Sequence, residues 1–384
     1  PWPEGFDEVA GADAAWTSAE DQSHSGTRSF SSRLIDHSQV AAIQHSDTYA
    51  GGTVRFWYKV DSQENFDLFT FSIDSNILLT ASGDSGWQLF EAPLAAGAHA
   101  LEWRYTKDGS VSEGNDAAWI DDFQLLVGCE NVNDVSQVEC EALVALYEAT
   151  GGPDWAKNLG WLTNPNVCDW YRITCDVDSN VTQIMLYANN LVGTIPPEIG
   201  NLTSLENLLL YNSPFIFTGI NQLSGSIPAE LGNLTNLREL ILDRNNLSGE
   251  IPEELGSLEN LVWLGLGNNQ LTGNIPSGLS DLSNLEILFL SGNELTGTIP
   301  VEFGILDSLR NMSLSGNLLE GAIPPALGSM DNLEQLSLGQ NQLTGVIPAE
   351  LGSLSKLEFL WIENNQLLGP IPSELGALTN LENI

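Results

Sequence analysis

The chain has 384 residues, with 51 Asp or Glu against 12 Lys or Arg, and a formal net charge of −39. Such a surface repels nucleic acid and anionic membranes, because binding to phosphate depends on Lys and Arg. The acidic residues are spread along the chain, and no apolar stretch is long enough to cross a bilayer. We therefore expect a protein kept soluble outside the cell, with no nucleic-acid partner and no direct membrane insertion in this segment.

Residues 1–128 contain short alternating apolar and polar runs separated by clusters of Gly, Ser, Asp and Asn. This pattern predicts an antiparallel β-sandwich. Strands are expected near 27–32, 39–44, 53–60, 68–73, 87–91, 99–105 and 118–125. The phrases SGTRSF at 25–30, VRFWY at 54–58 and AWIDDF at 118–123 resemble jelly-roll modules of the concanavalin-like, MAM-like and carbohydrate-binding kind.

Asp121 is the best candidate for a metal ligand in this region. If residues 119, 121, 123 and 125 alternate onto an inward face, Asp121 is a charge beside an apolar core and needs a partner. The jelly-roll resemblance implies a structural calcium near the last strand, with Asp7 and Asp116 as further ligands. A paired or exposed Asp121 is the alternative. The tryptophans could stack on sugar rings, although tryptophan at strand spacing is more often part of a core: Trp57, Trp87, Trp103 and Trp119.

All four cysteines lie between residues 129 and 175: Cys129, Cys140, Cys168 and Cys175. Their even number and close spacing predict two disulfides and an oxidising compartment. We prefer the pairs Cys129–Cys140 and Cys168–Cys175 among the three possible connectivities. Zinc is the alternative, but the spacings lack a C-x-x-C knuckle and no histidine lies nearby.

A helix that contains Cys140 is expected between Ser136 and Gly151. Ser136 and Glu139 form a capping-box pattern, and an apolar stripe at helical spacing follows before Gly151 and Gly152. The stripe consists of Ala142, Leu143, Leu146 and Tyr147.

From residue 234 onward the sequence repeats every 24 residues in the pattern L-x-x-L-x-x-L-x-L-x-x-N-x-L-x-G-x-I-P. Units start at Leu234, Leu258, Leu282, Leu306, Met330 and Leu354, two earlier units lie around Ile184 and Leu208, and a partial ninth starts at Leu378. The L-x-L segment predicts a short strand, the Asn an inward turn, and the x-x-L-G after Pro a helical turn. One repeat cannot bury its own apolar face, so the pattern predicts a solenoid. We expect the native chain to continue past the interrupted ninth unit.

The phrase L-x-G-x-I-P-x-x-L-G resembles the plant-type leucine-rich repeats of receptor-kinase ectodomains and polygalacturonase inhibitors. Trp155, Trp161 and the loop from Cys168 to Cys175 resemble the N-terminal cap of the same family. Plant caps usually carry Gly where this chain has Arg172, and they are less acidic, which suggests a bacterial extracellular protein. The expected parts are a jelly-roll module at 1–128, a disulfide-linked cap at 129–180 and a solenoid at 181–384, with eight complete repeats and a partial ninth.

The expected ligand site is the strand face of the solenoid, where residues flanking the inward leucines point to solvent. These positions hold a contiguous set of aromatic and other residues, and contiguous exposed apolar surface indicates an interaction site: Tyr187, Tyr211, Ile241, Asp243, Arg244, Trp263, Phe289, Phe359 and Trp361. We expect Trp263 and Phe289 at its centre, in one apolar band with Asp243 and Arg244 as polar anchors. Cover by another domain or a missing segment is the alternative. The second repeat also carries an insertion at 213–220 that is expected to fold back onto the repeats or, in the alternative, to form part of a binding edge.

These features predict an extracellular, secreted or cell-surface recognition or adhesion protein that binds a protein or glycan ligand on the repeats. In the alternative hypothesis, the jelly roll binds carbohydrate and the repeats form a stalk. A more distant one is ice binding, but Glu320 and Leu368 interrupt the required Ser and Thr row. We expect no enzymatic activity, since the repeats lack histidine and the chain has no H-E-x-x-H, G-x-S-x-G or P-loop motif.

Overall fold

The computed structural model describes residues 6–20, 22–24, 29–32, 35–49, 51–109, 115–213, 215 and 219–382. The chain divides into two compact units, residues 1–132 with 162–165 and residues 133–161 with 166–384. The division lies shortly after the boundary expected at 128/129. The 3-10 turn η1 (Cys129–Asn131) still belongs to the first unit, in which Val127 donates a backbone hydrogen bond to Leu162.

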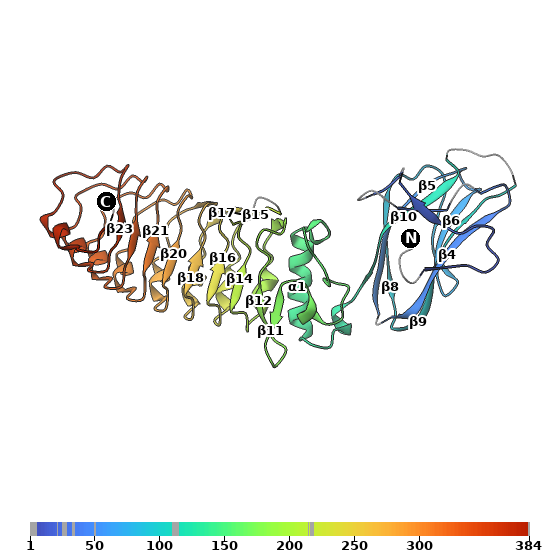
Figure 1. Cartoon of the computed structure of the whole chain (residues 1–384), viewed down its shortest axis with the longest axis horizontal. Helices are drawn as coiled ribbons and strands as arrows, with labels where there is room; N and C mark the ends of the chain where they lie inside the picture. The colour runs from blue at the N-terminus through green and yellow to red at the C-terminus, as the bar shows by residue number, and fades with distance from the viewer. Residues whose placement is uncertain are drawn as a thin grey trace. The chain divides into compact units, whose positions relative to one another are not determined.

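The first unit consists of two antiparallel five-stranded sheets (Figure 1). One sheet has the order β1 (Phe6–Glu8), β4 (Val40–Tyr49), β9 (Gly97–Thr106), β6 (Leu68–Ile73) and β7 (Asn76–Ala81). The other has the order β2 (Thr17–Ala19), β3 (Ser29–Ser31), β10 (Ala117–Leu126), β5 (Gly52–Asp61) and β8 (Gln88–Leu94). The sequence did not predict β1, β2 and β7. The first two are only three residues long, and β7 has adjacent exposed residues, Ile77 and Leu78, in place of alternation.

An aromatic core joins the two sheets. The ring of Trp103 in β9 lies 5.6 Å from Phe56 of β5 and 5.0 Å from Phe71 of β6, and all three side chains are fully buried. Phe6 of β1 and Phe123 of β10 meet across the sandwich at 5.3 Å. Shared aromatic packing of this kind makes the predicted antiparallel sandwich a single unit, whereas its jelly-roll classification stays a prediction.

A β-bulge changes which residues of β10 face the core. The pairing of β10 with β5 shifts between Asp121 and Gln124, and Asp122 has a φ of 51°. Ala118 and Ile120 point into the core before the bulge, and Phe123 and Leu125 pack against it afterwards. The predicted single face of residues 119, 121, 123 and 125 is therefore wrong: the extra residue at the bulge leaves Asp121 on the opposite side from Phe123.

The second unit begins with the cap. Helix α1 (Gln137–Ala149) starts with the predicted capping box, in which Ser136 and Glu139 satisfy each other's backbone N–H groups. The predicted stripe is buried. Two 3-10 turns, η2 (Gly152–Asp154) and η3 (Val167–Asp169), lead to strand β11 (Ile173–Cys175), which pairs antiparallel with the first repeat strand.

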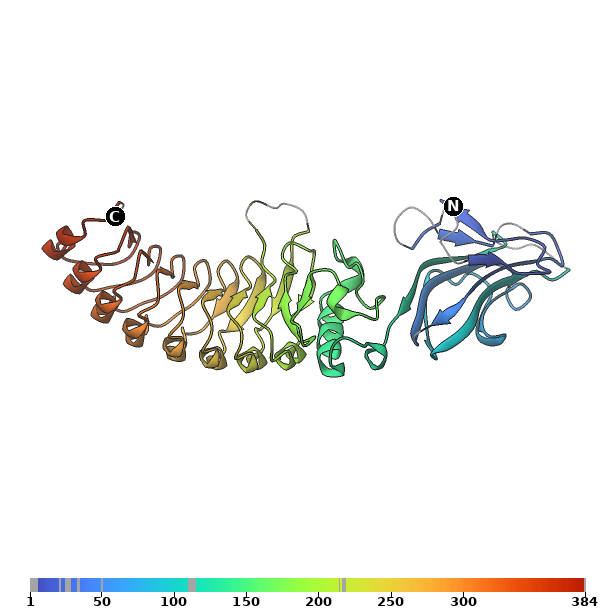
Figure 2. The same cartoon turned by 60° about the horizontal axis from the view of Figure 1, so that its bottom comes forward.

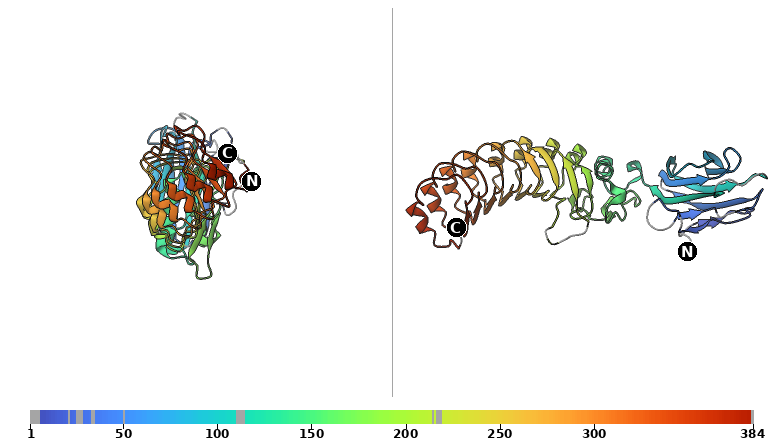
Figure 3. Two further views of the ribbon diagram at one scale, coloured as in Figure 1. Left: turned by 90° about the vertical axis from the view of Figure 1, so that its left-hand side faces the viewer. Right: turned by 90° about the horizontal axis from the view of Figure 1, so that it is seen from above.

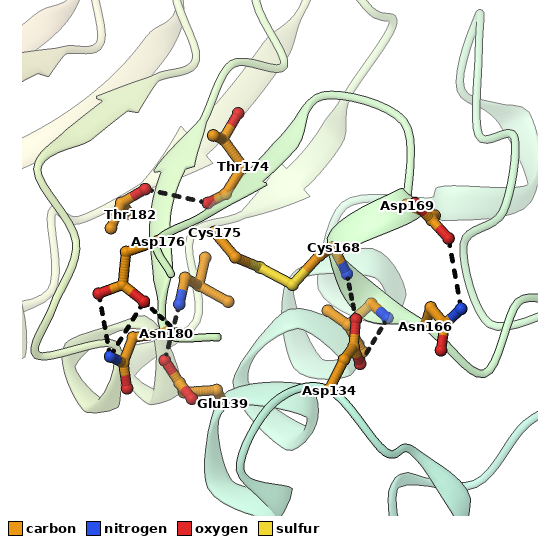
Figure 4. The surroundings of a disulfide bond; sticks show 12 residues. Asp134, Glu139, Asn166, Cys168, Asp169, Thr174, Cys175, Asp176, Asn180 and Thr182 are labelled. Carbon is orange, nitrogen blue, oxygen red and sulfur yellow. Dashed lines mark hydrogen bonds between the residues drawn. A yellow bond between two sulfur atoms is a disulfide. The ribbon is translucent and has the colours of Figure 1, made fainter. Parts of the chain in front are cut away.

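The disulfide Cys168–Cys175 lies between η3 and β11, and it confirms one predicted pair (Figure 4). Asp134 accepts hydrogen bonds from the backbone N–H groups of Val167 and Cys168, and Glu139 accepts one from Val181. Cys129 and Cys140 are also disulfide-bonded, and no cysteine is free. The bonded loop and α1 together close the end of the repeat core.

The repeats form a parallel sheet that continues β11 (Figures 1 and 2). Its strands are β12 (Val181–Ile184), β14 (Asn207–Leu209), β16 (Glu239–Ile241), β18 (Trp263–Gly265), β20 (Ile287–Phe289), β21 (Asn311–Ser313), β22 (Gln335–Ser337) and β23 (Phe359–Trp361). The eight strands match the eight predicted complete repeats. The ninth unit begins the same ladder, since Glu382 donates its N–H to Glu358.

A 3-10 helix follows each Ile-Pro segment, as predicted, and these helices lie along the outer side of the curved solenoid (Figure 3). They are η4 (Pro197–Asn201), η5 (Ala229–Asn233), η6 (Glu253–Ser257), η7 (Ser277–Asp281), η8 (Val301–Ile305), η9 (Pro325–Ser329), η10 (Ala349–Ser353) and η11 (Ser373–Ala377). A small second sheet runs between the two sides, with strands β13 (Val192–Thr194), β15 (Gln222–Gly225), β17 (Asn246–Glu250) and β19 (Gln270–Thr272). Because the 3-10 helices lie on the outer side, the strands of the large parallel sheet form the concave face of the solenoid.

The repeated asparagines form the predicted internal ladder. Asn293 donates from Nδ2 to Leu266 O and Leu290 O, at 3.0 Å each, and its Oδ1 accepts from the N–H of Leu271 at 3.0 Å. Asn245, Asn269, Asn317, Asn341 and Asn365 make equivalent bonds. Each side chain thereby satisfies backbone groups of two coils that water does not reach, which fixes the stacking register.

The insertion at 213–220 is described only in part. Phe215 is 86% exposed, so this residue does not pack back onto the repeats. Ile216 and Phe217 lie outside the described residues.

Among the described helices, none is long and apolar enough to span a membrane.

Candidate ligand-binding face

The concave face carries three columns of outward-pointing side chains, because alternate residues of each strand face solvent and the strands stack in register. The first column consists of Gln183, Asn207, Glu239, Trp263, Ile287, Asn311, Gln335 and Phe359. The second consists of Met185, Leu209, Ile241, Gly265, Phe289, Ser313, Ser337 and Trp361. The third consists of Tyr187, Tyr211, Asp243, Gly267, Ser291, Ser315, Gly339 and Glu363.

The predicted central residues lie in different columns. Trp263 is in the first column and pairs with Ile287, whereas Phe289 is in the second and pairs with Gly265. Tyr187 and Tyr211 are in the third column, since Ala188 donates its N–H to Tyr211 O. The predicted single apolar band is therefore wrong. Outward-pointing residues of one strand are two positions apart, and each of these positions belongs to a different column. The prediction treats residues from different columns as if they formed one row.

Two residues of the predicted set play a different part from the one expected. Ile241 is only 5% exposed, so it offers little surface to a ligand. Arg244 is exposed in the turn that follows the third column, with a φ of 59°, and its N–H donates to Gly267 O. Arg244 thus lies at the rim of the face. Trp263 is 36% exposed and is the large apolar side chain most open to solvent in the centre.

Gly265 and Gly267 allow their neighbours to close in over β18. A Cβ at Gly265 would collide with Oδ2 of Asp243, and a Cβ at Gly267 would collide with the ring of Phe289. The N–H of Gly267 donates to Asp243 Oδ1 at 2.6 Å. The two glycines therefore form a notch that is filled from one side by Asp243 and from the other by Phe289. Burial in this notch raises the pKa of the Asp243 carboxyl to about 7, although the Gly267 N–H opposes the shift.

An aromatic stack lies at the cap end of the face. The rings of Tyr187 and Tyr211 are stacked at 5.2 Å, and the guanidinium of Arg172 lies 3.9 Å from the centre of the Tyr187 ring and 5.3 Å from that of Tyr171. Arg172 also donates to Met185 O and Tyr187 O. Sequence reasoning missed Tyr171 and Arg172 as part of this face. The signal was present, because Arg172 replaces the Gly that the resemblance to plant caps leads us to expect, and it stands with a φ of 64°.

Small polar side chains lie from the fifth to the seventh repeat and bond to one another. Ser291 and Ser313 are joined by a 2.6 Å hydrogen bond, as are Ser315 and Ser337, and Asn311 donates to Gln335. Phe359 and Trp361 then form a second aromatic patch, with rings stacked at 5.2 Å. The face consequently has an aromatic cap half, a self-satisfied polar stretch and a small terminal patch.

The three predicted calcium ligands do not come together. Asp7 is exposed on β1, in the sheet opposite β10, which carries Asp121. Oδ2 of Asp121 accepts from the N–H of His24, and Asp116 forms an ion pair with Lys107 at 2.6 Å. The described residues contain no group of three or more His, Cys, Asp or Glu side chains that could hold a metal ion. Calcium binding stays a prediction without a ligand set in the part of the chain that the structure describes.

The predicted tryptophans of the sandwich separate into two groups. Trp103 is in the core and Trp119 is only 4% exposed. Trp57 and Trp87 are half-buried on the outer face of the second sheet, where the imidazole of His24 stacks on Trp57 at 3.7 Å and lies 5.9 Å from Trp87. Asp122 holds His24 in place through a 3.0 Å contact with Nδ1. This outer cluster is therefore the one place in the described part of the sandwich where predicted sugar-stacking tryptophans reach the surface.

The period, the ladder and the 3-10 turns together define a leucine-rich-repeat solenoid, and comparison with known proteins agrees. Leucine rich repeat models match residues 236–258, 259–319, 332–354 and 356–378. Leucine-rich repeat protein 1 of Arabidopsis thaliana is 42% identical over 73 residues, which are 19% of this chain. The chain spans about a third of the length of the curated relatives it matches first, 34% for this one.

Two solved plant structures share the fold of the second unit. One is the leucine-rich-repeat ectodomain of the Arabidopsis thaliana receptor kinase GASSHO1/SCHENGEN3 in complex with Casparian strip integrity factor 2. It has a TM-score of 0.55 and 36% identity, over 64% of this chain and 32% of that one. The other is the Arabidopsis HAESA ectodomain in complex with an IDA peptide hormone ligand, with a TM-score of 0.50 and 33% identity, over 64% and 45% of the two chains.

Proposed function

We propose that this chain is an extracellular recognition module that binds a protein ligand on the concave face of its repeats. The observation that carries the proposal is the cap half of that face, where Tyr187, Tyr211, Asp243, Trp263 and Phe289 follow one another on five successive repeats, spread over the three columns. Aromatic residues dominate the energetics of interfaces when they are clustered and partly desolvated. The stacked tyrosines and the filled glycine notch hold these side chains in place before a ligand arrives, which lowers the entropic cost of binding.

Three further observations support this function. The disulfides and the similarity to receptor ectodomains indicate a secreted or surface-exposed domain. Both of those ectodomain structures are complexes with a peptide or protein factor.

In this chain the sandwich unit would serve as an accessory binding or spacer module. The expectation of a bacterial source depends on Arg172 and the acidic composition alone.

The test is the double substitution Trp263→Ala and Phe289→Ala in the intact chain. Ligands are selected from a secreted-protein and peptide display library, and their affinity is measured by surface plasmon resonance. We expect the double variant to bind at least about 30-fold more weakly, since truncating a central aromatic residue typically costs about 2 kcal/mol or more.

A matched control removes two exposed apolar side chains from the outer side of the solenoid. Val301 and Ile305 in η8 are 57% and 65% exposed, and Val301→Ala with Ile305→Ala should leave affinity within about twofold. Melting curves verify that both double variants are folded. Unchanged affinity in the folded concave variant would refute the proposed site.

The second candidate function is carbohydrate binding by the sandwich. The outer cluster of Trp57 and Trp87 favours it, since aromatic rings at a surface are suited to stack on sugar rings. A glycan array probed with the intact chain and with Trp57→Ala/Trp87→Ala tests it, and a glycan signal that survives the substitution would remove this candidate. Glu320 and the 71% exposed Leu368 interrupt the Ser and Thr row that ice binding would require.

A further inference from the structure

Asp243 is held in an unusual position for a carboxylate on the concave face. The face shows Gly in both the second and third columns at one repeat alone, at Gly265 and Gly267. The carboxylate of Asp243 lies across this notch, with Oδ1 bonded to the Gly267 N–H and Oδ2 over Gly265. Any side chain at Gly265 would displace it. The backbone has thus left room for the carboxylate of Asp243 to lie flat on the neighbouring coil.

No basic side chain of the described residues forms an ion pair with Asp243. Its side chain accepts a hydrogen bond from the Gly267 N–H, and the charge of Arg244, which lies in the exposed turn at the rim, lowers its pKa without a direct ion pair. Partial burial without an ion pair disfavours the charged form, which is the origin of the raised pKa. Carboxylates that are desolvated in a cleft and form no internal ion pair are candidates for ligand recognition.

Aromatic rings lie on both sides of this carboxylate. Tyr211 is its third-column neighbour on the cap side, as the bond from the Asn212 N–H to Asp243 O shows. Phe289 enters the notch from the opposite side. A carboxylate between aromatic faces is suited to a guanidinium or ammonium group, which pairs with the oxygens while its planar or methylene part lies on the rings. The chain provides its own example nearby, where the Arg172 guanidinium stacks on Tyr187.

The charge of the solenoid also favours a cation. Residues 181–384 contain 22 acidic side chains and only four basic ones, Arg238, Arg244, Arg310 and Lys356. Arg310 is already paired with Glu286 and Glu334. A surface of this kind attracts a positively charged partner and accelerates its association, while it repels an acidic one.

We infer that the concave face takes a cationic peptide segment, and that one Arg or Lys side chain of this segment docks on Asp243 between Tyr211 and Phe289. This inference depends on the proposed function, because it specifies the chemistry of a ligand at the same face. The Arg or Lys side chain supplies the charge that the notch lacks, and the neighbouring aromatic side chains contact the rest of the segment.

The test uses a random 12-residue peptide library displayed against the intact chain at pH 8. Each selected peptide is tested for binding to the unmodified chain and to the Trp263→Ala/Phe289→Ala variant. In the peptides whose binding depends on these two residues, each Arg is then replaced by citrulline and each Lys by norleucine. We expect dependent binders to be rich in Arg or Lys, and one such replacement in each to weaken binding at least tenfold. Asp243→Asn should weaken the parent peptide equally, since the amide keeps the shape and the Gly267 hydrogen bond but not the charge.

A double-mutant cycle shows whether the two groups meet. In Asp243→Asn the critical citrulline or norleucine replacement should have no further effect, because the interaction is already lost. Glu363→Gln is the matched control: it removes a carboxylate from the same column in the last complete repeat, and it should change affinity by less than twofold. If both variants weaken binding equally, the effect is general electrostatic attraction and the specific docking at Asp243 is wrong.

The pH dependence provides a second measurement. Asp243 must be ionised to bind the cation, so affinity should rise about tenfold from pH 6 to pH 8 for a carboxyl of pKa about 7. The other charged or titratable side chains near Asp243 are Tyr211, Glu239 and Arg244. The repeat with Gly265 and Gly267 and the repeat with Phe289 have no charged or titratable side chain in the three columns. The rise should persist in Glu239→Gln and disappear in Asp243→Asn.

The failures of the two proposals are distinguishable. Binders that depend on Trp263 and Phe289 but tolerate Asp243→Asn would overturn the cation inference and leave the proposed function intact. A library that yields only binders independent of Trp263 and Phe289, or none at all, would overturn the proposed function and this inference together.

Discussion

The two units of this chain stabilise their folds in opposite ways. In the repeats, each coil bonds to the next through residues about 22 to 27 positions apart, and the same contacts recur along the ladder. In the sandwich, partners are distant and unlike: Ala41 in β4 pairs with Tyr105 in β9, and the Ala118 N–H bonds to the Ser32 hydroxyl. A surface position can therefore be assigned from sequence in the first case, but in the second it depends on how separate strands meet.

The treatment of buried polar groups shows the same contrast. The solenoid uses neutral asparagines that are fully satisfied by backbone groups, repeated once per coil. In the described part of the sandwich, the ion pair Lys107–Asp116 is buried, with side chains 3% and 8% exposed. Asp67, fully buried, accepts from the Asp108 N–H, and burial raises its pKa. Loss of one group should therefore have a different cost in each unit.

The largest effect is expected from Lys107→Met in the sandwich. This substitution leaves the Asp116 carboxylate buried without its cation, and breaking a buried pair in this way costs about 3–5 kcal/mol. Differential scanning calorimetry should show a lower melting temperature for the sandwich transition and an unchanged one for the repeats. A repeat transition that shifts equally would show that the two units do not unfold independently. Lys107→Met combined with Asp116→Leu should recover most of the loss.

A smaller effect is expected from Asn293→Ala in the ladder. The change leaves two backbone carbonyls and one N–H without their partner, at a cost of about 2–4 kcal/mol after partial relaxation. Asn284→Ala is the control, because Asn284 is exposed and donates one bond to Glu259 O, and it should cost less than about 1 kcal/mol. Chemical denaturation of both variants measures the difference, and equal midpoints would contradict the structural role of the ladder.

The smallest effect is expected from opening the cap disulfide. The disulfide closes a short loop and thereby stabilises the fold by about 2–3 kcal/mol in the chain-entropy model. Cys168→Ser with Cys175→Ser removes this stabilisation. The repeat transition should weaken by no more than this, since Asp134 and Glu139 still hold the cap by hydrogen bonds. Thiol titration of the unreduced native chain should find no reactive cysteine, and four reactive thiols would contradict the oxidised state.

The sequence by itself determined most of the solenoid. The 24-residue period, the inward leucines, the asparagine ladder, the capping box at Ser136 and the pairing of Cys168 with Cys175 all follow from local spacing. Neighbouring coils are copies of one another, so each contact in one repeat predicts the same contact in the next. The outward-pointing positions of the repeat strands follow for the same reason.

Tertiary structure alone decided the features that depend on unequal neighbours. The separation of Trp263, Phe289 and Tyr211 into three columns follows from the pleat, and the burial of Asp243 follows from two glycines one repeat away. In the sandwich, one bulge in β10 turned Asp121 away from the core, and Asp116, which was predicted as a calcium ligand, pairs with Lys107. Such outcomes depend on which side chains meet across strands, and a sequence read along one dimension contains no local signal for those encounters.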